Sequence, residues 1–188
     1  MVKLKAGVLV GSLRRESFNK KISQALIALA PETLSLEPVE IGGLPLFNED
    51  LDNDSPPLAW VEFRKKMQLV DCALFVTPEY NRSVPGVLKN AIDVGSRPYG
   101  KSIWDGKPAA VISVSPGRIG GFGANHHLRQ SLVFLNVPTM QQPEAYIGEV
   151  AKLFDAPGGA LDEATKRHLK TFIDGFAVWA GRNTNRRL

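Results

Sequence analysis

The chain has 188 residues, 44% hydrophobic and 22% charged, which is typical of a globular protein with a sizeable core. No stretch approaches the roughly 20 apolar residues of a membrane span, and the only cysteine, Cys72, excludes an internal disulfide. The net charge of +4 comes from scattered basic residues, with one local cluster in the terminal RNTNRRL, which is typical of a solvated tail.

We therefore expect one domain over residues 1–188, with neither a nucleic-acid nor a membrane partner. The apolar run near the N-terminus lacks a small-residue cleavage site, so we expect a cytoplasmic protein. Cys72 opens an apolar run and is interpreted as a small residue of the core.

Hydrophobic periodicity and turn residues divide the chain into alternating strands and helices. In chain order the predicted elements are a strand over 4–10, a helix over 17–30, a strand over 34–41, a helix over 57–71, a strand over 73–77, a helix over 84–95, a strand over 108–115, a helix over 126–137, a short strand near 139–142 and a helix over 162–182. Ser17 is a candidate N-cap, and Pro31 marks the end of the first helix.

The strands are continuous apolar runs, which indicates a parallel sheet buried on both faces. We predict the α/β class, a three-layer fold with a five-stranded parallel sheet in the order 2-1-3-4-5. In that order, a ligand binds at the carboxyl edge of the sheet, between strands one and three.

Three unusual loops follow strands one, three and four: GSLRRESFN, PEYNRSVPG and SPGRIGGFG. The strand order brings them together at one edge of the sheet. The first loop is neither a Walker loop nor a dinucleotide fingerprint, since Gly11 is its only glycine. Its hydroxyls, guanidinium groups and backbone N–H groups precede a helix and form a candidate anion site.

The second loop is short and bounded by Pro78 and Pro85, and it suits the edge of a planar heterocycle rather than a phosphate. The glycines of the third loop allow a flat ligand to approach the backbone. Simpler interpretations are that Ser17 and Ser83 are only helix caps, that the arginines of the first loop are a solvated pair, and that the glycines serve turns.

These loops, together with the continuation VTPEYNRSVPGVLKNAIDVGSRP and SVSPGRIGGFGANHHLRQSLVFL, resemble the NADPH-dependent FMN reductase family. The similarity is nearest to its quinone reductase members, also described as chromate reductases. One departure is Val94, where the family often has Trp.

The resemblance implies a flavodoxin-like fold that binds FMN non-covalently, takes electrons from NADPH or NADH and reduces a small acceptor such as a quinone or chromate. It also implies a homodimer or homotetramer. By the same resemblance, the FMN-binding residues are Ser12, Arg14, Ser17, Phe18, Asn19, Pro78, Glu79, Tyr80, Asn81, Ser83, Val114, Ser115 and Gly117.

The flavin performs the redox chemistry in such proteins, so we assign no catalytic acid or base and no metal site. Glu79 is interpreted as structural. His126 and His127 are adjacent on a helix and do not share a face, which favours a subunit-interface role, with Glu144, over metal binding. The loop from Arg97 to Trp104 is expected to expose its aromatic side chains in a subunit interface.

Two alternative functions are an electron carrier of the flavodoxin type and a non-enzymatic nucleotide-binding regulator. Carriers of the first kind tend to be acidic, whereas this chain has a pI of about 9.3. The choice between NADPH and NADH stays open, because Arg97, Lys101 or Arg118 could each meet a 2′-phosphate.

Overall fold

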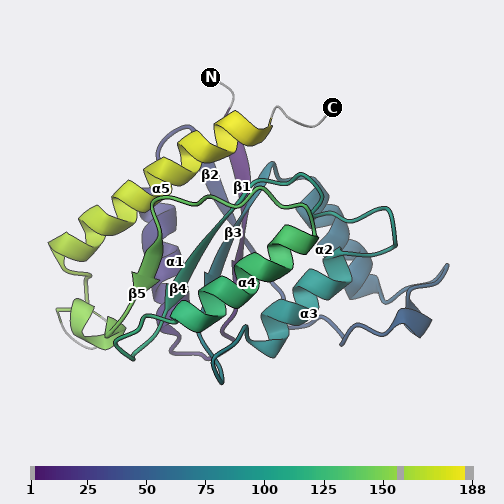
Figure 1. Cartoon of the computed structure of the whole chain (residues 1–188), viewed down its shortest axis with the longest axis horizontal. Coiled ribbons are helices and arrows are strands. Elements are labelled where there is room, and N and C mark those ends of the chain that lie inside the picture. The colour runs from purple at the N-terminus through teal and green to yellow at the C-terminus, as the bar shows by residue number, and fades with distance from the viewer. Residues whose placement is uncertain (1–2, 156–158, 185–188) are drawn as a thin grey trace.

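The computed structural model describes residues 3–155 and 159–184 (Figure 1). Its main elements are β1 (Leu4–Val10), α1 (Phe18–Leu29), β2 (Leu34–Val39), the 3₁₀ turn η1 (Glu49–Leu51), α2 (Leu58–Gln68), β3 (Cys72–Thr77), α3 (Gly86–Gly95), β4 (Ala109–Val114), α4 (Phe122–Phe134), β5 (Ala145–Ile147), the 3₁₀ turn η2 (Val150–Leu153) and α5 (Glu163–Thr184). The five strands form one parallel sheet in the order β2-β1-β3-β4-β5, which confirms the predicted strand order.

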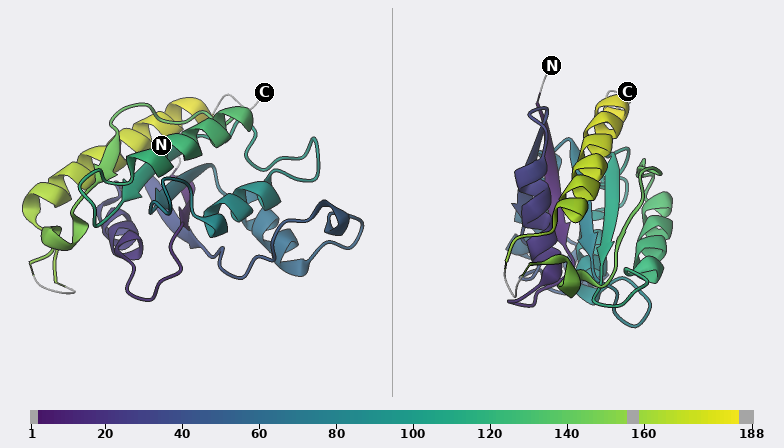
Figure 2. Two further views of the ribbon diagram at one scale, coloured as in Figure 1. Left: turned by 60° about the horizontal axis from the view of Figure 1, so that its bottom comes forward. Right: turned by 90° about the vertical axis from the view of Figure 1, so that its left-hand side faces the viewer.

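The sheet separates two apolar cores. Helices α1 and α5 cover one face, and α2, α3 and α4 cover the other (Figure 2). Every residue of β3 and of β4 is buried, which explains why these strands are continuous apolar runs in the sequence. Side chains alternate between the cores, so that Leu74 packs in the first and Phe75 in the second.

Helix α1 begins and ends as its sequence predicts. The hydroxyl of Ser17 accepts a hydrogen bond from the backbone N–H of Lys20, at 3.3 Å, and is therefore an N-cap. The helix ends at Leu29, just before Pro31. The edge strand β2 contains Pro38, which an edge position tolerates because only one side of the strand is paired.

The last strand differs from its prediction. The expected strand near 139–142 is wrong, because Thr139 makes only an isolated bridge with Ala109. Pro143 cannot donate a backbone hydrogen bond, and pairing with β4 begins at Ala145. Helix α4 also begins earlier than predicted, since Gly121 has a φ of 75° and serves as its N-cap.

The loop before β4 does not expose all of its aromatic residues. Tyr99 is 91% exposed, but Trp104 is fully buried and donates its indole N–H to the carbonyl of Ile92, at 2.9 Å. Gly95 makes room for this ring, because a Cβ at that position would lie 2.5 Å from the indole nitrogen. The prediction of exposed aromatics is therefore wrong for Trp104.

Three further features bear on the sequence predictions. Cys72 is buried, as expected. Within residues 3–155 and 159–184, no helix combines the length and apolar character needed to cross a membrane. In the terminal segment predicted to be a solvated tail, Arg182 is exposed and Asn183 is buried, and residues 185–188 lie outside the described part of the chain.

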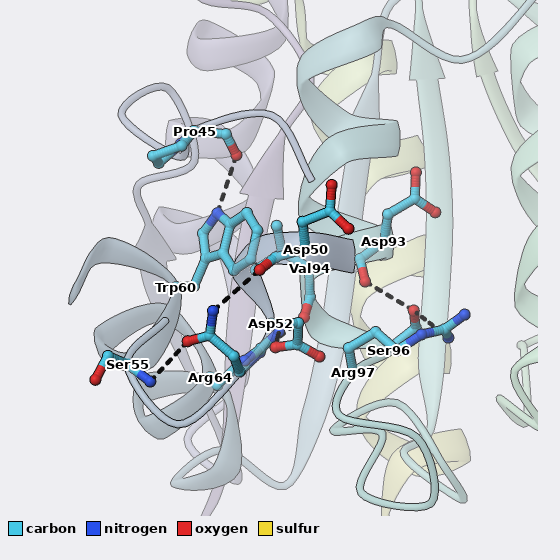
Figure 3. Close-up of polar contacts among 11 residues, drawn as sticks. Pro45, Asp50, Asp52, Ser55, Trp60, Arg64, Asp93, Val94, Ser96 and Arg97 are labelled. Carbon is cyan, nitrogen blue, oxygen red and sulfur yellow. Dashed lines mark hydrogen bonds and ion pairs between the residues drawn. The ribbon is translucent and has the colours of Figure 1, made fainter. Parts of the chain in front are cut away.

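A buried ion pair fixes the long segment between β2 and α2 (Figure 3). The Arg64 guanidinium donates to the Asp52 carboxylate and to the carbonyl of Val94, each at 2.8 Å, and the Arg64 and Asp52 side chains are 9% and 7% exposed. The indole of Trp60 donates to the carbonyl of Pro45 at 2.9 Å. These contacts join the segment to α2 and to the end of α3.

Replacing Arg64 by Met should lower the free energy of unfolding by about 3–5 kcal/mol, because Asp52 would keep a buried charge without its partner. Urea denaturation measures the change. Adding Asp52→Leu to Arg64→Met should restore part of the loss. The neighbouring Lys65 is exposed, so Lys65→Met should change stability by less than about 0.5 kcal/mol. Equal effects of Arg64→Met and Lys65→Met would contradict the anchoring role.

Candidate active site at the carboxyl edge of the sheet

Close packing brings the first two loops together. The backbone N–H of Gly11 donates to the carbonyl of Val76 at 2.9 Å, which extends the pairing of β1 with β3 into the loops. A Cβ at Gly11 would lie 3.1 Å from Pro78 and 3.4 Å from Pro85. The residue after β1 is therefore glycine because the loop after β3 lies directly against it.

The third loop joins the same group. The side-chain amide of Asn19, at the start of α1, donates to the carbonyl of Val114, at the end of β4, at 3.4 Å. A Cβ at Gly121, in the third loop, would lie 3.6 Å from the Cβ of Glu79, in the second. The predicted convergence of the three loops is thus present in the structure, although they are far apart in the sequence.

The first loop is buried at its hydroxyls and exposed at its cations. Ser12 and Ser17 are 3% and 2% exposed, while Arg14 and Arg15 are exposed. The first turn of a helix also presents backbone N–H groups and the positive end of its dipole. Buried hydroxyls, a helix N-terminus and exposed cations make this loop a candidate anion site.

Asn19 offers the most direct test of whether these loops fit FMN. The residue is 5% exposed, and its Oδ1 is the one buried side-chain oxygen or nitrogen without a hydrogen-bond partner among the described residues. A buried acceptor of this kind carries a desolvation cost unless a donor reaches it. A polyhydroxylated ligand chain supplies such donors, so this position fits the ribityl chain of FMN.

The second loop forms a two-residue hairpin. Tyr80 and Ser83 exchange backbone hydrogen bonds of 3.1 and 3.0 Å, and the two residues between them, Asn81 and Arg82, have φ values of 51° and 65°. Such φ values are typical of a type I′ turn. Tyr80, in this hairpin, is 45% exposed.

Ser83 does not cap α3, as one interpretation of the sequence had it. The N-cap of α3 is Pro85, which has no side-chain capping bond. The Ser83 hydroxyl instead lies 3.1 Å from Nδ1 of His127, on α4. The neighbouring His126 contacts the Tyr146 hydroxyl instead. No group of three or more metal-binding side chains gathers anywhere in the described ranges.

The third loop is held by the chain that follows β5. The hydroxyl of Ser115 accepts from the backbone N–H of Gly117 at 3.1 Å, and the backbone N–H of Ser115 donates to the carbonyl of Ile147 at 2.9 Å. The carbonyl of Gly117 accepts from Glu149 at 3.1 Å. Val114 is buried, and Gly117 is exposed at the edge of the site.

A polar network under this loop was not predicted. Asn125 is fully buried, donates to the Ser113 hydroxyl at 3.3 Å and accepts from the Arg129 guanidinium at 2.8 Å. Arg129 also donates to the carbonyl of Met140 at 2.8 Å. An asparagine just after a glycine-rich loop was the only available signal, and it is also a common helix-start residue.

His126 and Glu144, which the sequence paired, are connected through Tyr146. The Tyr146 hydroxyl donates to the Glu144 carboxylate at 2.8 Å and lies 3.1 Å from Nε2 of His126. The Phe122 ring packs on both the histidine and the tyrosine. Burial, and then the hydrogen bond and charge of Glu144, raise the pKa of Tyr146 to about 12.

Comparison with known proteins decides the family. The model of the family described as NADPH-dependent FMN reductase matches residues 4–152. The chain belongs to this family. Its membership confirms the prediction of an oxidoreductase that uses FMN and a nicotinamide donor.

Individual relatives agree with the family. The chain is 62% identical over 176 residues to a quinone reductase from Pseudomonas putida, covering 94% of each protein. It superposes with a TM-score of 0.88 on the flavoenzyme NAD(P)H:(acceptor) oxidoreductase FerB from Paracoccus denitrificans, at 42% identity over 96% of this chain and 98% of that one. The chain also superposes on a flavodoxin from Pseudomonas aeruginosa with a TM-score of 0.58, at 15% identity over 95% of this chain and 99% of that one. The predicted flavodoxin-like fold is thereby confirmed.

Replacing Glu144 by Gln in this member of the family should lower the pKa of Tyr146 from about 12 towards, but not to, its ordinary value of 10.0, because burial remains. Folding raises the pKa of Tyr146, so its protonated form is favoured in the folded protein. The contribution of Tyr146 to the free energy of unfolding is therefore fully present below its ordinary pKa and is lost as the pH rises through its pKa in the folded protein. Ultraviolet absorbance titration of tyrosinate measures the shift, with Tyr146→Phe identifying the signal. An unchanged tyrosine pKa in Glu144→Gln would refute the contact.

Proposed function

We propose that the protein is an FMN-dependent NAD(P)H:quinone oxidoreductase. The observation that carries this proposal is the junction of three loops at the carboxyl edge of the sheet, with the unpartnered Oδ1 of Asn19 buried in it. The Pseudomonas putida relative named quinone reductase, to which the chain is 62% identical, supports a quinone as the acceptor. Chromate is a second acceptor within the same proposal.

The three loops divide the work of binding FMN in this proposal. The first loop and the start of α1 bind the phosphate and ribityl chain, and the hairpin and the third loop bind the ring. The residues proposed to bind the phosphate and ribityl chain are Ser12, Arg14, Ser17, Phe18 and Asn19. Those proposed to bind the ring are Pro78, Glu79, Tyr80, Asn81, Ser83, Val114, Ser115 and Gly117.

When bound, FMN would supply the hydride chemistry that links NAD(P)H to a quinone acceptor. The N–H groups of Tyr80 and Ser83 close the hairpin, so the N–H of Asn81 is the hairpin group that would donate to the ring edge and stabilise negative charge there. The half-exposed Tyr80 ring offers an aromatic face at the edge of the site. No side chain is needed as an acid or base, since water supplies the proton that the acceptor takes up.

We propose that NAD(P)H and the acceptor occupy the same place in the active site in turn, which gives ping-pong kinetics. Steady oxidation of NADPH by the purified protein with a quinone, together with release of FMN on denaturation, is the experiment that tests this function. A flavodoxin-type carrier would show no such turnover without a protein partner. A nucleotide-binding regulator would show none at all.

Replacing Arg14 and Ser17 by Ala should weaken FMN binding on the order of a hundredfold, because two hydrogen bonds to a charged phosphate are lost. Fluorescence titration of the flavin-free protein measures the affinity. Ser17→Ala also removes the N-cap of α1 and should lower stability by about 1 kcal/mol. The exposed Arg14 has no such role in the fold, so Arg14→Ala alone isolates the phosphate contact.

Riboflavin is the matched control, since it has the ring and the ribityl chain without the phosphate. Arg14→Ala should leave riboflavin affinity within about twofold of that of the unmodified protein. Equal weakening of FMN and riboflavin would mean that the first loop is not a phosphate site.

We further propose a cytoplasmic homo-oligomer, at least a dimer, without nucleic-acid or membrane partners. At the end of helix α4, the adjacent apolar residues Val133 and Phe134 are 73% and 88% exposed, and we propose that a second copy of the chain covers them. Light scattering at micromolar concentration should give a multiple of the 20.5 kDa chain mass, and a mass of one chain would contradict the proposal.

A further inference from the structure

The carboxylate of Glu79 lies at the N-terminus of α4, far from its own place in the sequence. Its Oε2 accepts a hydrogen bond of 3.0 Å from the backbone N–H of Ala124, and its side chain is 11% exposed. The N-cap of α4 is Gly121, which has no side chain to bond the first turn. Counting from Gly121, Ala124 is the third helical residue, whose N–H an N-cap side chain ordinarily satisfies. Glu79 therefore supplies the missing cap from another loop.

One glycine of the third loop is explained by this contact. A Cβ at Gly123 would lie 2.9 Å from Oε2 of Glu79 and 3.0 Å from the carbonyl oxygen of Arg82. Gly121 is favoured instead by its φ of 75° and by the Cβ of Ser113, which would lie 3.1 Å from an added Cβ. The loop thus leaves room for the carboxylate at Gly123.

The same contact fixes one end of the hairpin. Glu79 immediately precedes Tyr80, whose backbone bonds with Ser83 close the turn. At the other end, the Ser83 hydroxyl lies 3.1 Å from Nδ1 of His127 on α4. Helix α4 therefore holds the hairpin at both ends, and the first of these attachments is a charge-assisted hydrogen bond in a largely buried place.

The charge of Glu79 is balanced mainly by the helix. The N-terminus of an α-helix carries a partial positive charge that a carboxylate offsets. Arg82 also approaches the carboxylate, at 3.3 Å, but its side chain is 76% exposed, so solvent screens this pair strongly. Removing the carboxylate would leave a positive helix end uncompensated at the ring side of the site.

We propose that Glu79 is a positioning residue for the flavin ring. It places the hairpin, with the backbone groups of Tyr80 and Asn81, by capping α4, and it cancels the positive end of that helix next to the ring. This inference rests on the proposed function and assigns the residue two separable effects. The hydrogen bond sets the hairpin position, and the charge sets the redox potential of the ring.

Two substitutions separate the effects. In Glu79→Gln the amide oxygen still accepts from the Ala124 N–H. The hairpin should therefore stay protected from hydrogen exchange, and riboflavin affinity should stay within about threefold of that of the unmodified protein. Because the negative charge is lost, the midpoint potential of the bound flavin should become more positive. In Glu79→Ala both effects are lost, and riboflavin affinity should fall about tenfold or more.

Hydrogen exchange of residues 79–84 in the flavin-free protein gives a readout that needs neither flavin nor turnover. Exchange there should increase at least about tenfold in Glu79→Ala and be restored by Glu79→Gln. The control is Glu163→Gln, which removes a carboxylate from the first turn of α5, where its side chain is 75% exposed. It should change neither hairpin exchange, nor riboflavin affinity, nor the potential.

Unchanged hairpin exchange and riboflavin affinity in Glu79→Ala would overturn the positioning role. A potential unchanged in Glu79→Gln would overturn the electrostatic one. Neither result would touch the proposed function, which fails separately if the unmodified protein does not bind FMN. If Glu79→Ala does not fold, Glu79→Gln still tests the proposal through the potential.

Discussion

The site depends on one constraint, which is that β3 lies between β1 and β4 and pairs with both in parallel. Because all three strands run the same way, their carboxyl ends and the loops that follow them meet at one edge. Both faces of the central strands are buried, so a shift in register would displace an entire core and not a single contact. The two hydrophobic cores therefore fix the position of the loops at the site.

On this platform the loops are fixed by a few polar contacts between elements remote in sequence. Asn19 reaches the end of β4, Glu79 reaches the start of α4, and Asn125 reaches Ser113 beneath the third loop. Each adds a side-chain hydrogen bond to the few backbone bonds that the loops make. The bonds of Asn19 and Asn125 are buried, where a hydrogen bond is stronger than in water. The loops can therefore be short of regular structure and still hold defined positions.

The sequence predicts well what depends on local periodicity and poorly what depends on distant partners. The buried strands, the Ser17 cap and the strand order follow from apolar runs, capping residues and the rules of parallel sheets. The three-residue β5 is too short for a periodic signal, and Trp104 is buried only because Gly95, on another element, leaves space for it. Contacts such as that of Glu79 with α4 have no signature in either segment alone.

If Asn19 binds the flavin as proposed, its unpartnered oxygen links the stability of the chain to the ligand. A buried acceptor without a partner costs on the order of 1–3 kcal/mol, and no group of the described protein supplies a donor to this one. A ligand hydroxyl that donates to this atom removes the cost and adds the usual mass-action stabilisation of a bound state. In a cell, where proteases sample the transiently unfolded fraction, the abundance of the protein would then follow the supply of flavin.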